Sequence, residues 1–277
     1  MTLALRLLRG YAGAIYDLIG ALVAGTPTGD LFDLSPHGVN EFDLILVADA
    51  YYWVQDNKTL TNVRHAATVG GLASAAIDST VNVRYPSIQW DGSTWHVWGQ
   101  HPGTFGIDHY TASSVTGPWT LADSFGTHMS DPQVRQDPVT GTWWCAYKKD
   151  SPLYVGMFSS SSPDGPWTDQ GYTFTTAGHP AFASVEEADP CPAFFNGHAY
   201  LSFAGYDGMT QVIAMTELDR GNSMQALTSG TIIRSPSAGW EGSKIFTPVF
   251  LDDGSKRLYY AANAGDTTAG WGAVTAA

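Results

Sequence analysis

The stretch Ser113-Ser114-Val115-Thr116-Gly117-Pro118-Trp119 recurs as Ser161-Ser162-Pro163-Asp164-Gly165-Pro166-Trp167 later in the chain. The two copies start roughly 48 residues apart, within the period of about 40–50 residues that is typical of propeller blades. Two copies of a seven-residue pattern at one period are hard to obtain by chance. This repeat therefore indicates an architecture built from similar units.

Five hairpin signals accompany this repeat. In each, a short apolar run is followed by a tight polar turn and then an aromatic-rich run, as in Asp91-Gly92 before Trp95-His96-Val97-Trp98. The five turns are Ala48-Asp49, Asp91-Gly92, Thr140-Gly141, Asn196-Gly197 and Asp253-Gly254. Polar turns between alternating apolar runs predict β-hairpins. We therefore predict an all-β fold, a five-bladed β-propeller with an N-terminal helical extension.

The apolar run before each turn predicts the innermost strand of a blade. These strands are expected at Asp43–Val47, Pro86–Trp90, Pro132–Gln136, Cys191–Phe195 and Pro248–Leu251. Proline precedes or opens four of them, and proline is tolerated at the first position of a strand. Residues 36–277 are thus predicted to form the propeller, and residues 1–35 a separate helical or anchoring segment.

Residues 3–24 are the stretch with a helical pattern. Small or polar residues recur on one face, and the other faces are mostly apolar. Asp17 interrupts the apolar run, so neither a signal peptide nor a membrane-spanning helix is expected. The segment could dock on this propeller, or it could join a protein partner or a second copy of the chain.

The net charge of -13 narrows the range of partners. Binding to nucleic acid needs clustered Lys and Arg, and anionic membrane surfaces also attract basic segments. We expect no nucleic-acid partner and no membrane partner. The 10 Trp residues supply flat faces suited to stacking on sugar rings, so a glycan or oligosaccharide is the expected ligand.

Acidic residues gather where the inner strands begin. Asp43 lies at the start of the first, Asp131 at the start of the third, and Glu187 and Asp189 shortly before the fourth. A propeller brings these strand starts around one axis, so three blades are expected to offer carboxylates to one pocket.

With these acids, the chain resembles the five-bladed glycoside hydrolases of families 43, 32, 62, 68 and 117. The Ser130-Asp131-Pro132-Gln133-Val134 segment, the two Gly-Pro-Trp motifs and Gly239-Trp240-Glu241 carry the resemblance. It implies a base or nucleophile at Asp43, a stabilising Asp131 and an acid at Glu187. Two carboxyl groups of different pKa flank the scissile bond in such enzymes, with inverting or retaining outcome set by their separation.

This chain departs from the pattern of those families in two places. Leu44 rather than proline follows Asp43, and Glu187 is one residue out of register with Pro190. Displacement by one residue turns a strand side chain to the other face, unless a bulge restores it. If no bulge restores Glu187, Asp189 is the acid that points toward the axis, and its side chain is shorter.

Other residues are expected to contact the substrate. These are Arg84, Tyr85, His128, Asp189 and Trp240, which lie at strand starts or in connecting segments. His128 and His179 lack the spacing of metal ligands, so we expect no metal and no cofactor.

Two functions remain open at this point. One is a hydrolase that acts on arabinose-, xylose- or fructose-containing glycans. The other is a non-catalytic glycan-binding or structural module of a larger assembly, for example a phage tail or capsid. Fold alone does not decide between them. The sequence leaves the location of the protein open, and both an extracellular and a virion-associated location are compatible with it.

Overall fold

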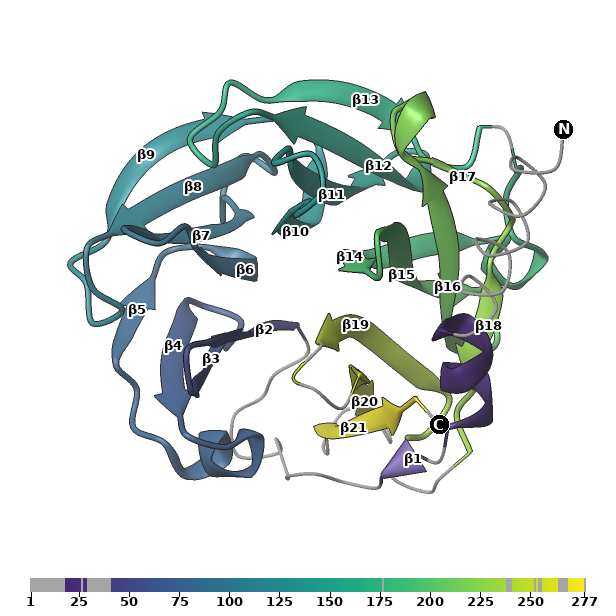
Figure 1. Ribbon diagram of the computed structural model, residues 1–277, viewed down its shortest axis with the longest axis horizontal. Helices are drawn as coiled ribbons and strands as arrows, with labels where there is room; N and C mark the ends of the chain where they lie inside the picture. The colour runs from purple at the N-terminus through teal and green to yellow at the C-terminus, as the bar shows by residue number, and fades with distance from the viewer. Residues whose placement is uncertain are drawn as a thin grey trace, which may run out of the picture.

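Antiparallel sheets stand radially around a central axis in the computed structural model (Figure 1). The structure describes residues 18–25, 27–28, 41–175, 177–237, 241–251, 253, 256–263 and 269–276. Within that part of the chain the predicted five-bladed propeller is confirmed.

Each blade begins with its innermost strand and proceeds outward. Blade 1 contains β2 (Phe42–Val47), β3 (Ala50–Asp56), β4 (Thr61–Ala66) and β5 (Ser79–Val81). Blade 2 contains β6 (Arg84–Trp90), β7 (Trp95–Gln100), β8 (Ile107–Ala112) and β9 (Thr120–Phe125). Blade 3 contains β10 (Met129–Gln136), β11 (Trp143–Asp150), β12 (Leu153–Ser160) and β13 (Thr168–Tyr172).

The last two blades follow the same order. Blade 4 contains β14 (Glu186–Phe195), β15 (His198–Tyr206) and β16 (Gln211–Asp219), with β17 (Gln225–Ala226) and β18 (Thr231–Arg234) paired to β16. Blade 5 contains β19 (Lys244–Leu251), β20 (Arg257–Asn263), β21 (Ala269–Thr275) and β1 (Pro27–Thr28). Short 3₁₀ helices lie at Val69–Ser74, Ala181–Ala183 and Arg220–Asn222.

The ring is closed by the two ends of the chain. β1 pairs antiparallel with β21, so a strand from the N-terminal segment completes the C-terminal blade. Residues 18–24 are helical, and Leu18 and Leu22 are buried in the apolar cluster that contains blade 5. The described end of the expected helix thus lies on this chain's own propeller, while residues 3–17 lie outside the described residues.

Four inner strands carry the same irregularity, a bulge at a residue–proline pair. The pairs are Tyr85-Pro86, Asp131-Pro132, Asp189-Pro190 and Thr247-Pro248, and the strand register shifts at each one. The residue before each proline has a left-handed backbone, with φ between 49° and 52°. The prolines therefore lie inside the strands, and the expectation that they open them is corrected. A bulge leaves a residue out of the ladder, so the missing proline N–H breaks no ladder bond.

The two Gly-Pro-Trp motifs join neighbouring blades. Trp119 of blade 2 donates from its indole N–H to Ser79 of blade 1 at 2.9 Å. Trp167 of blade 3 stacks on Phe125 of blade 2, with ring centroids 5.2 Å apart. The glycines have φ of 76° and 83°, which only glycine adopts without strain. The repeat in the sequence thus encodes contacts between blades.

The apolar core lies between the blades. Trp53, Trp98, Tyr200 and Tyr260 are fully buried, and they belong to clusters shared by adjacent sheets. In the described part of the chain, no helix has the length and apolar character needed to cross a membrane.

Candidate active site

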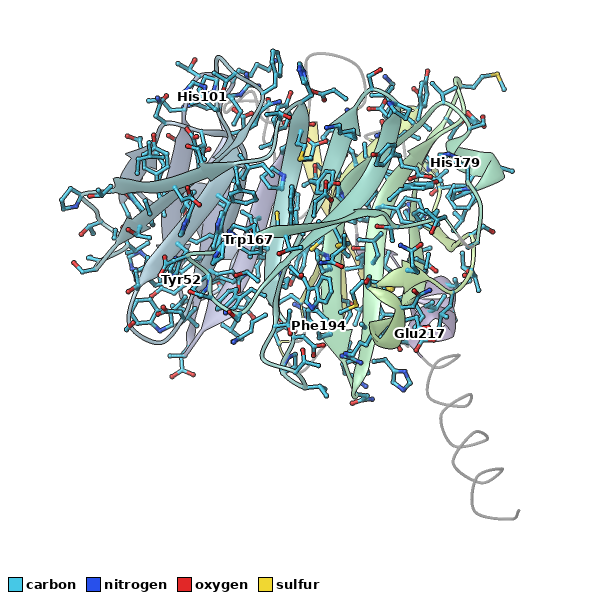
Figure 2. All side chains as sticks on the ribbon, turned by 90° about the horizontal axis from the view of Figure 1, so that it is seen from above. Tyr52, His101, Trp167, His179, Phe194 and Glu217 are labelled. Carbon is cyan, nitrogen blue, oxygen red and sulfur yellow. The ribbon has the colours of Figure 1, made fainter. Side chains whose placement is uncertain are left out.

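An axial pocket of about 440 Å³ opens at the face where the inner strands begin. Its walls carry five acidic side chains, two lysines and three aromatic rings: Glu41, Asp131, Asp150, Glu186, Asp189, Lys148, Lys244, Tyr85, Phe105 and Phe246. A narrower recess beneath it reaches Gln133, Thr247 and Pro248. Figure 2 shows the molecule edge-on, with His101 and His179 toward one face and Phe194 and Glu217 toward the opposite one. The acidic side chains that line the axial pocket come from blades 1, 3 and 4.

The proline bulges direct two of these acids toward the axis. Asp131 and Asp189 occupy the same left-handed position in blades 3 and 4. The backbone N–H of Asp189 donates to the carboxylate of Asp131, and the N–H of Thr247 donates to Asp189 Oδ2 at 3.2 Å. The bulges at Asp131 and Asp189 thus each supply an inward acid, and those at Asp189 and Thr247 each supply an N–H to the acid of the preceding blade. Sparsely populated backbone conformations of this kind often occur at functional sites.

Glu41 is the acid of blade 1. It lies directly before β2 and lines both the pocket and the deeper recess. Burial raises the pKa of Glu41 well above its usual range, and the negative charges of Asp189, Asp131 and Asp56 raise it further, while Arg84 lowers it. Glu41, Asp131 and Asp189 cannot all ionise without mutual repulsion.

Asp131 and Asp189 form a tightly coupled pair. Burial raises the pKa of both carboxyl groups, and the charge of Asp131 raises that of Asp189 further. Lys148 acts in the opposite direction on both. Lys148 also forms an ion pair with Glu186 at 2.5 Å. The positive charge of Lys148 thus offsets the repulsion among Asp131, Asp189 and Glu186.

Asp43 does not line the pocket, although it was expected to be catalytic. It is fully buried and pairs with Arg135, whose Nη1 lies 2.9 Å from Asp43 Oδ2. Ser87 Oγ and the backbone N–H of Ile88 also donate to Oδ2, at 3.0 and 2.9 Å. Glu41 lies two residues earlier, just before β2. Glu41 is the one that reaches the pocket.

Glu187 also lies outside the pocket. Its carboxylate is buried between blades 3 and 4, where the Val155 N–H and the Tyr172 hydroxyl donate to it at 3.1 Å each. His179 Nδ1 lies 2.9 Å from Glu187 Oε1. The bulge after Ala188 brings Asp189 to the axis instead. Catalytic roles for Asp43 and Glu187 are therefore not retained.

The other expected substrate-binding residues divide. Tyr85 and Asp189 line the pocket. Arg84 does not; its Nε contacts Asp56 Oδ2 at 2.6 Å, and its guanidinium lies 5.2 Å from the centre of the Tyr85 ring. His128 is exposed outside the lining, and Trp240 lies outside the described residues.

Several lining residues escaped the sequence analysis. Glu41 has no proline after it, since blade 1 lacks the bulge, and Lys148 comes from β11 rather than from an inner strand. Phe105 and Gln100 come from β7 and the turn after it. Lys148 lies on the second strand of blade 3. Only the fold shows that this strand comes close enough to the axis for Lys148 to reach the pocket.

Comparison with solved structures places the fold. No family model matches the chain, and no curated protein matches it significantly. The solved structures that it matches include five-bladed family 43 glycoside hydrolases, so the resemblance seen in the sequence is confirmed at the level of the fold. The chain therefore shares the five-bladed propeller fold of these hydrolases.

Three of these solved structures illustrate the similarity. An α-L-arabinofuranosidase from Lactobacillus brevis is 14% identical with a TM-score of 0.65, and the match covers 89% of this chain and 92% of that one. An α-L-arabinanase from Cellvibrio cellulosa, complexed with arabinohexaose, is 10% identical with a TM-score of 0.58 and coverages of 84% and 90%. An exo-β-1,3-galactanase from Phanerochaete chrysosporium, with galactotriose, is 14% identical with a TM-score of 0.60 and coverages of 85% and 59%.

Proposed function

We propose that the axial pocket hydrolyses glycosidic bonds, with Glu41, Asp131 and Asp189 as its acids. The observation that carries this proposal is the convergence of these three side chains, from three blades, on one open pocket. Glycoside hydrolysis needs one carboxyl group that holds a proton and one that is ionised. Crowded, buried carboxyl groups separate in pKa, which provides both forms.

Asp189 is the proposed general acid. Burial and the charge of Asp131 both raise its pKa, so it keeps its proton at a pH where an ordinary aspartate has lost it. Asp131 is the residue that maintains this shift, the role that the resemblance implies for it. Removal of Asp131 should therefore impair proton donation even if Asp131 never touches the scissile oxygen.

Glu41 is the proposed base or nucleophile. It takes the place in blade 1 that the resemblance gave to Asp43. Arg84 favours its ionised form, while burial and the charges of the neighbouring aspartates oppose it. Whether it attacks directly or through a water depends on its separation from Asp189, about 5–5.5 Å for retention and about 6.5–9.5 Å for inversion.

The proposed substrate is a neutral glycan that contains arabinose or xylose. Acids outnumber lysines in the lining, so anionic sugars are repelled. Tyr85, Phe105 and Phe246 offer rings on which a sugar can stack. The volume falls in the range of about 300–1,000 Å³ that is usual for small-ligand sites. An α-L-arabinofuranosidase and an α-L-arabinanase among the structural neighbours support arabinose, while xylose and fructose remain predictions of the resemblance.

Aryl arabinofuranosides and xylosides with leaving groups of different acidity test the proposal. The parent should release the aryl group, and Asp131→Ala and Glu41→Gln should abolish turnover. Asp189→Asn should retain more activity on substrates with the best leaving groups, since these need no proton. Activity in the parent that survives Glu41→Gln and Asp131→Ala would place the chemistry elsewhere.

A non-catalytic glycan-binding module is the second candidate. The position of Glu187, buried between blades 3 and 4, favours this second candidate. The acid that blade 4 supplies to the pocket is then an aspartate, whose side chain is one methylene shorter. Calorimetry with arabino- and xylo-oligosaccharides that shows binding without turnover in the parent selects this candidate. The structural comparisons do not support the alternative of a virion protein.

A further inference from the structure

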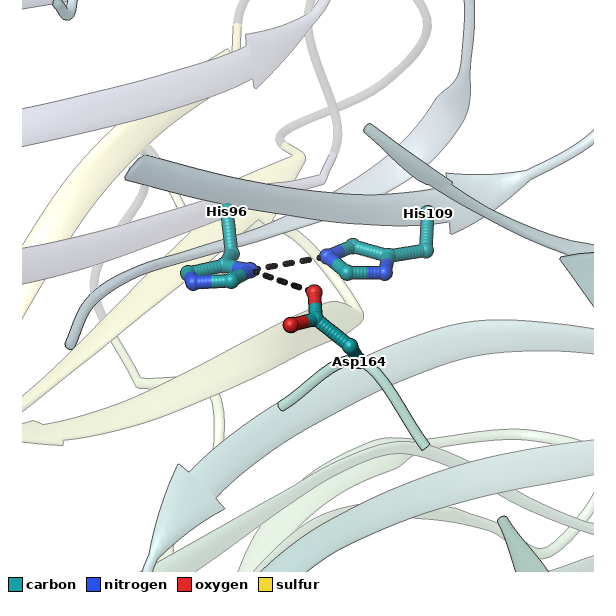
Figure 3. Close-up of side chains that lie close together, drawn as sticks. All are labelled: His96, His109 and Asp164. Atoms are coloured by element: carbon teal, nitrogen blue, oxygen red, sulfur yellow. Dashed lines mark hydrogen bonds and ion pairs between the residues drawn. The ribbon is translucent and has the colours of Figure 1, made fainter. Parts of the chain in front are cut away.

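A second cluster of chemically active side chains lies outside the axial pocket, between blades 2 and 3. His96 of β7 and His109 of β8 point toward Asp164, which comes from the Gly-Pro-Trp turn of blade 3 (Figure 3). None of the three lines the axial pocket. The proposed hydrolysis therefore does not use them.

The three side chains converge on one point. His96 Nδ1 lies 2.9 Å from His109 Nε2 and 3.9 Å from Asp164 Oδ1. All three ligand atoms lie within 4.8 Å of one another. Bonds of about 2.0–2.1 Å around a tetrahedral zinc ion separate its ligand atoms by roughly 3.4 Å. The observed distances bracket that value, so small side-chain rotations bring all three atoms into the range of coordination.

The hydrogen bonds orient one ring for metal binding. His96 Nε2 lies 3.2 Å from Asp91 Oδ2, and this carboxylate favours the proton on Nε2. Nδ1 then accepts a hydrogen bond from His109 Nε2, and a bound ion takes the place of the shared proton. A carboxylate behind a histidine ligand is a common support in metal sites, where it fixes the tautomer and the ring orientation.

Packing holds both rings in place. The indole of Trp98 stacks on His109 and His96, with ring centroids 4.6 and 5.4 Å apart. Both imidazoles are fully buried. The stack therefore holds the two rings in fixed orientations.

We propose that His96, His109 and Asp164 bind a divalent transition-metal ion, above all Zn²⁺, which joins blade 2 to blade 3. Imidazole nitrogens select such ions over Mg²⁺ and Ca²⁺, which prefer oxygen ligands. Asp164 is 64% exposed, so an ion can enter from solvent and keep a water as its fourth ligand. The proposal departs from the sequence-based expectation of no metal, since ligands from two blades give no spacing motif.

The chain contains its own matched comparison. Thr116 occupies the position of Asp164 in the first copy of the Gly-Pro-Trp motif. Asp164→Thr therefore removes the acidic ligand while it keeps a residue that this turn accepts. His65 and Asp78 form an exposed histidine–carboxylate pair at 2.8 Å without a second histidine, so His65→Gln controls for binding at surface histidines.

The experiment uses the full chain without a histidine tag. Zn²⁺ titration by calorimetry should show one equivalent bound, with a higher unfolding temperature, and Mg²⁺ or Ca²⁺ should give neither. Co²⁺ should give the visible absorption of a nitrogen-ligated tetrahedral site. Asp91→Asn should weaken Zn²⁺ binding by about 10–100-fold, Asp164→Thr by at least as much, and His65→Gln not at all.

Two results overturn the proposal. One is a parent chain that shows no Zn²⁺-dependent change in heat or unfolding temperature. The other is binding that Asp164→Thr leaves as tight as in the parent, because the ion then sits elsewhere. His96→Gln provides a second variant if Asp164→Thr alone leaves a weak site, and its retention of tight binding is equally contrary to the proposal.

Discussion

Arg135 of blade 3 and Asp43 of blade 1 form a buried ion pair, with Arg135 Nη2 2.5 Å from Asp43 Oδ1. The same carboxylate accepts from Ser87 and Ile88 of blade 2, so one aspartate connects three inner strands. Neither member of the pair lines the axial pocket, so Asp43 contributes to the structural framework of the propeller.

Asp43→Asn should destabilise the protein. Removal of one member of a buried ion pair leaves an uncompensated charge, at a cost of about 3–5 kcal/mol. Urea unfolding at neutral pH measures the loss. Asp49→Asn, on the exposed turn after β2, is the control and should change stability by no more than about 0.5 kcal/mol. A stable Asp43→Asn variant that has lost glycan binding would restore Asp43 to the site.

Asp189→Asn should stabilise the protein at neutral and alkaline pH. The pKa of Asp189 is raised in the folded state, so folding favours the protonated form. The parent therefore loses stability as the pH rises from the unfolded-state pKa near 4 through the raised value. An asparagine carries no such penalty, and we expect a gain of about 1–2 kcal/mol at pH 8 that vanishes near pH 4. Urea unfolding at both pH values checks this. A gain that is equal at both pH values contradicts the electrostatic cause.

Glu187→Ala should have the opposite effect from Asp189→Asn, although the two acids are two residues apart. The carboxylate of Glu187 accepts from the Val155 N–H and the Tyr172 hydroxyl in a buried space, and its removal leaves both donors without an acceptor, at a cost of about 1–3 kcal/mol of stability. Glycan binding and any hydrolysis should persist in the folded variant. Paired unfolding and activity measurements on both variants test this contrast, and loss of activity in folded Glu187→Ala returns Glu187 to the site.

Hydrolysis should be confined to a narrow pH range. The proposed base, Glu41, has a pKa well above its usual range, so activity should begin to rise only above the pH at which an ordinary glutamate ionises. Activity should fall again when Asp189 loses its proton. Measurement of kcat/KM against pH checks both limbs. Asp131→Asn removes a charge that raises both pKa values, so in any residual activity both limbs should move to lower pH.

Leu22→Ala should weaken the closure of the ring. Leu22 is fully buried in the cluster around blade 5, and truncation of a buried leucine costs about 2–5 kcal/mol. The neighbouring Val23 is 51% exposed, so Val23→Ala is the matched control. Thermal unfolding compares the two. Equal unfolding temperatures for both variants would mean that the packing of Leu22 against blade 5 contributes nothing to stability.

Two acids of the pocket could be predicted from the sequence, because a proline follows each of them. Asp131-Pro132 and Asp189-Pro190 each form the same kind of bulge. The sequence already indicated Asp189 as the inward acid if Glu187 stayed out of register. Glu41 could not be found in this way, since blade 1 lacks the bulge. Asp43 is engaged by Arg135 and Ser87 of other blades, and these contacts are not visible in the local sequence.

Local sequence determined the blades themselves. Polar turns, aromatic strands and the Gly-Pro-Trp repeat specify hairpins through short-range backbone preferences, and five hairpins of one period form a ring. The tertiary structure alone decided which carboxylates meet in the pocket, that β1 completes blade 5, and that Asp164 approaches two histidines of another blade. These contacts join residues far apart in the chain, and their distances are set by packing between blades, which no local pattern records.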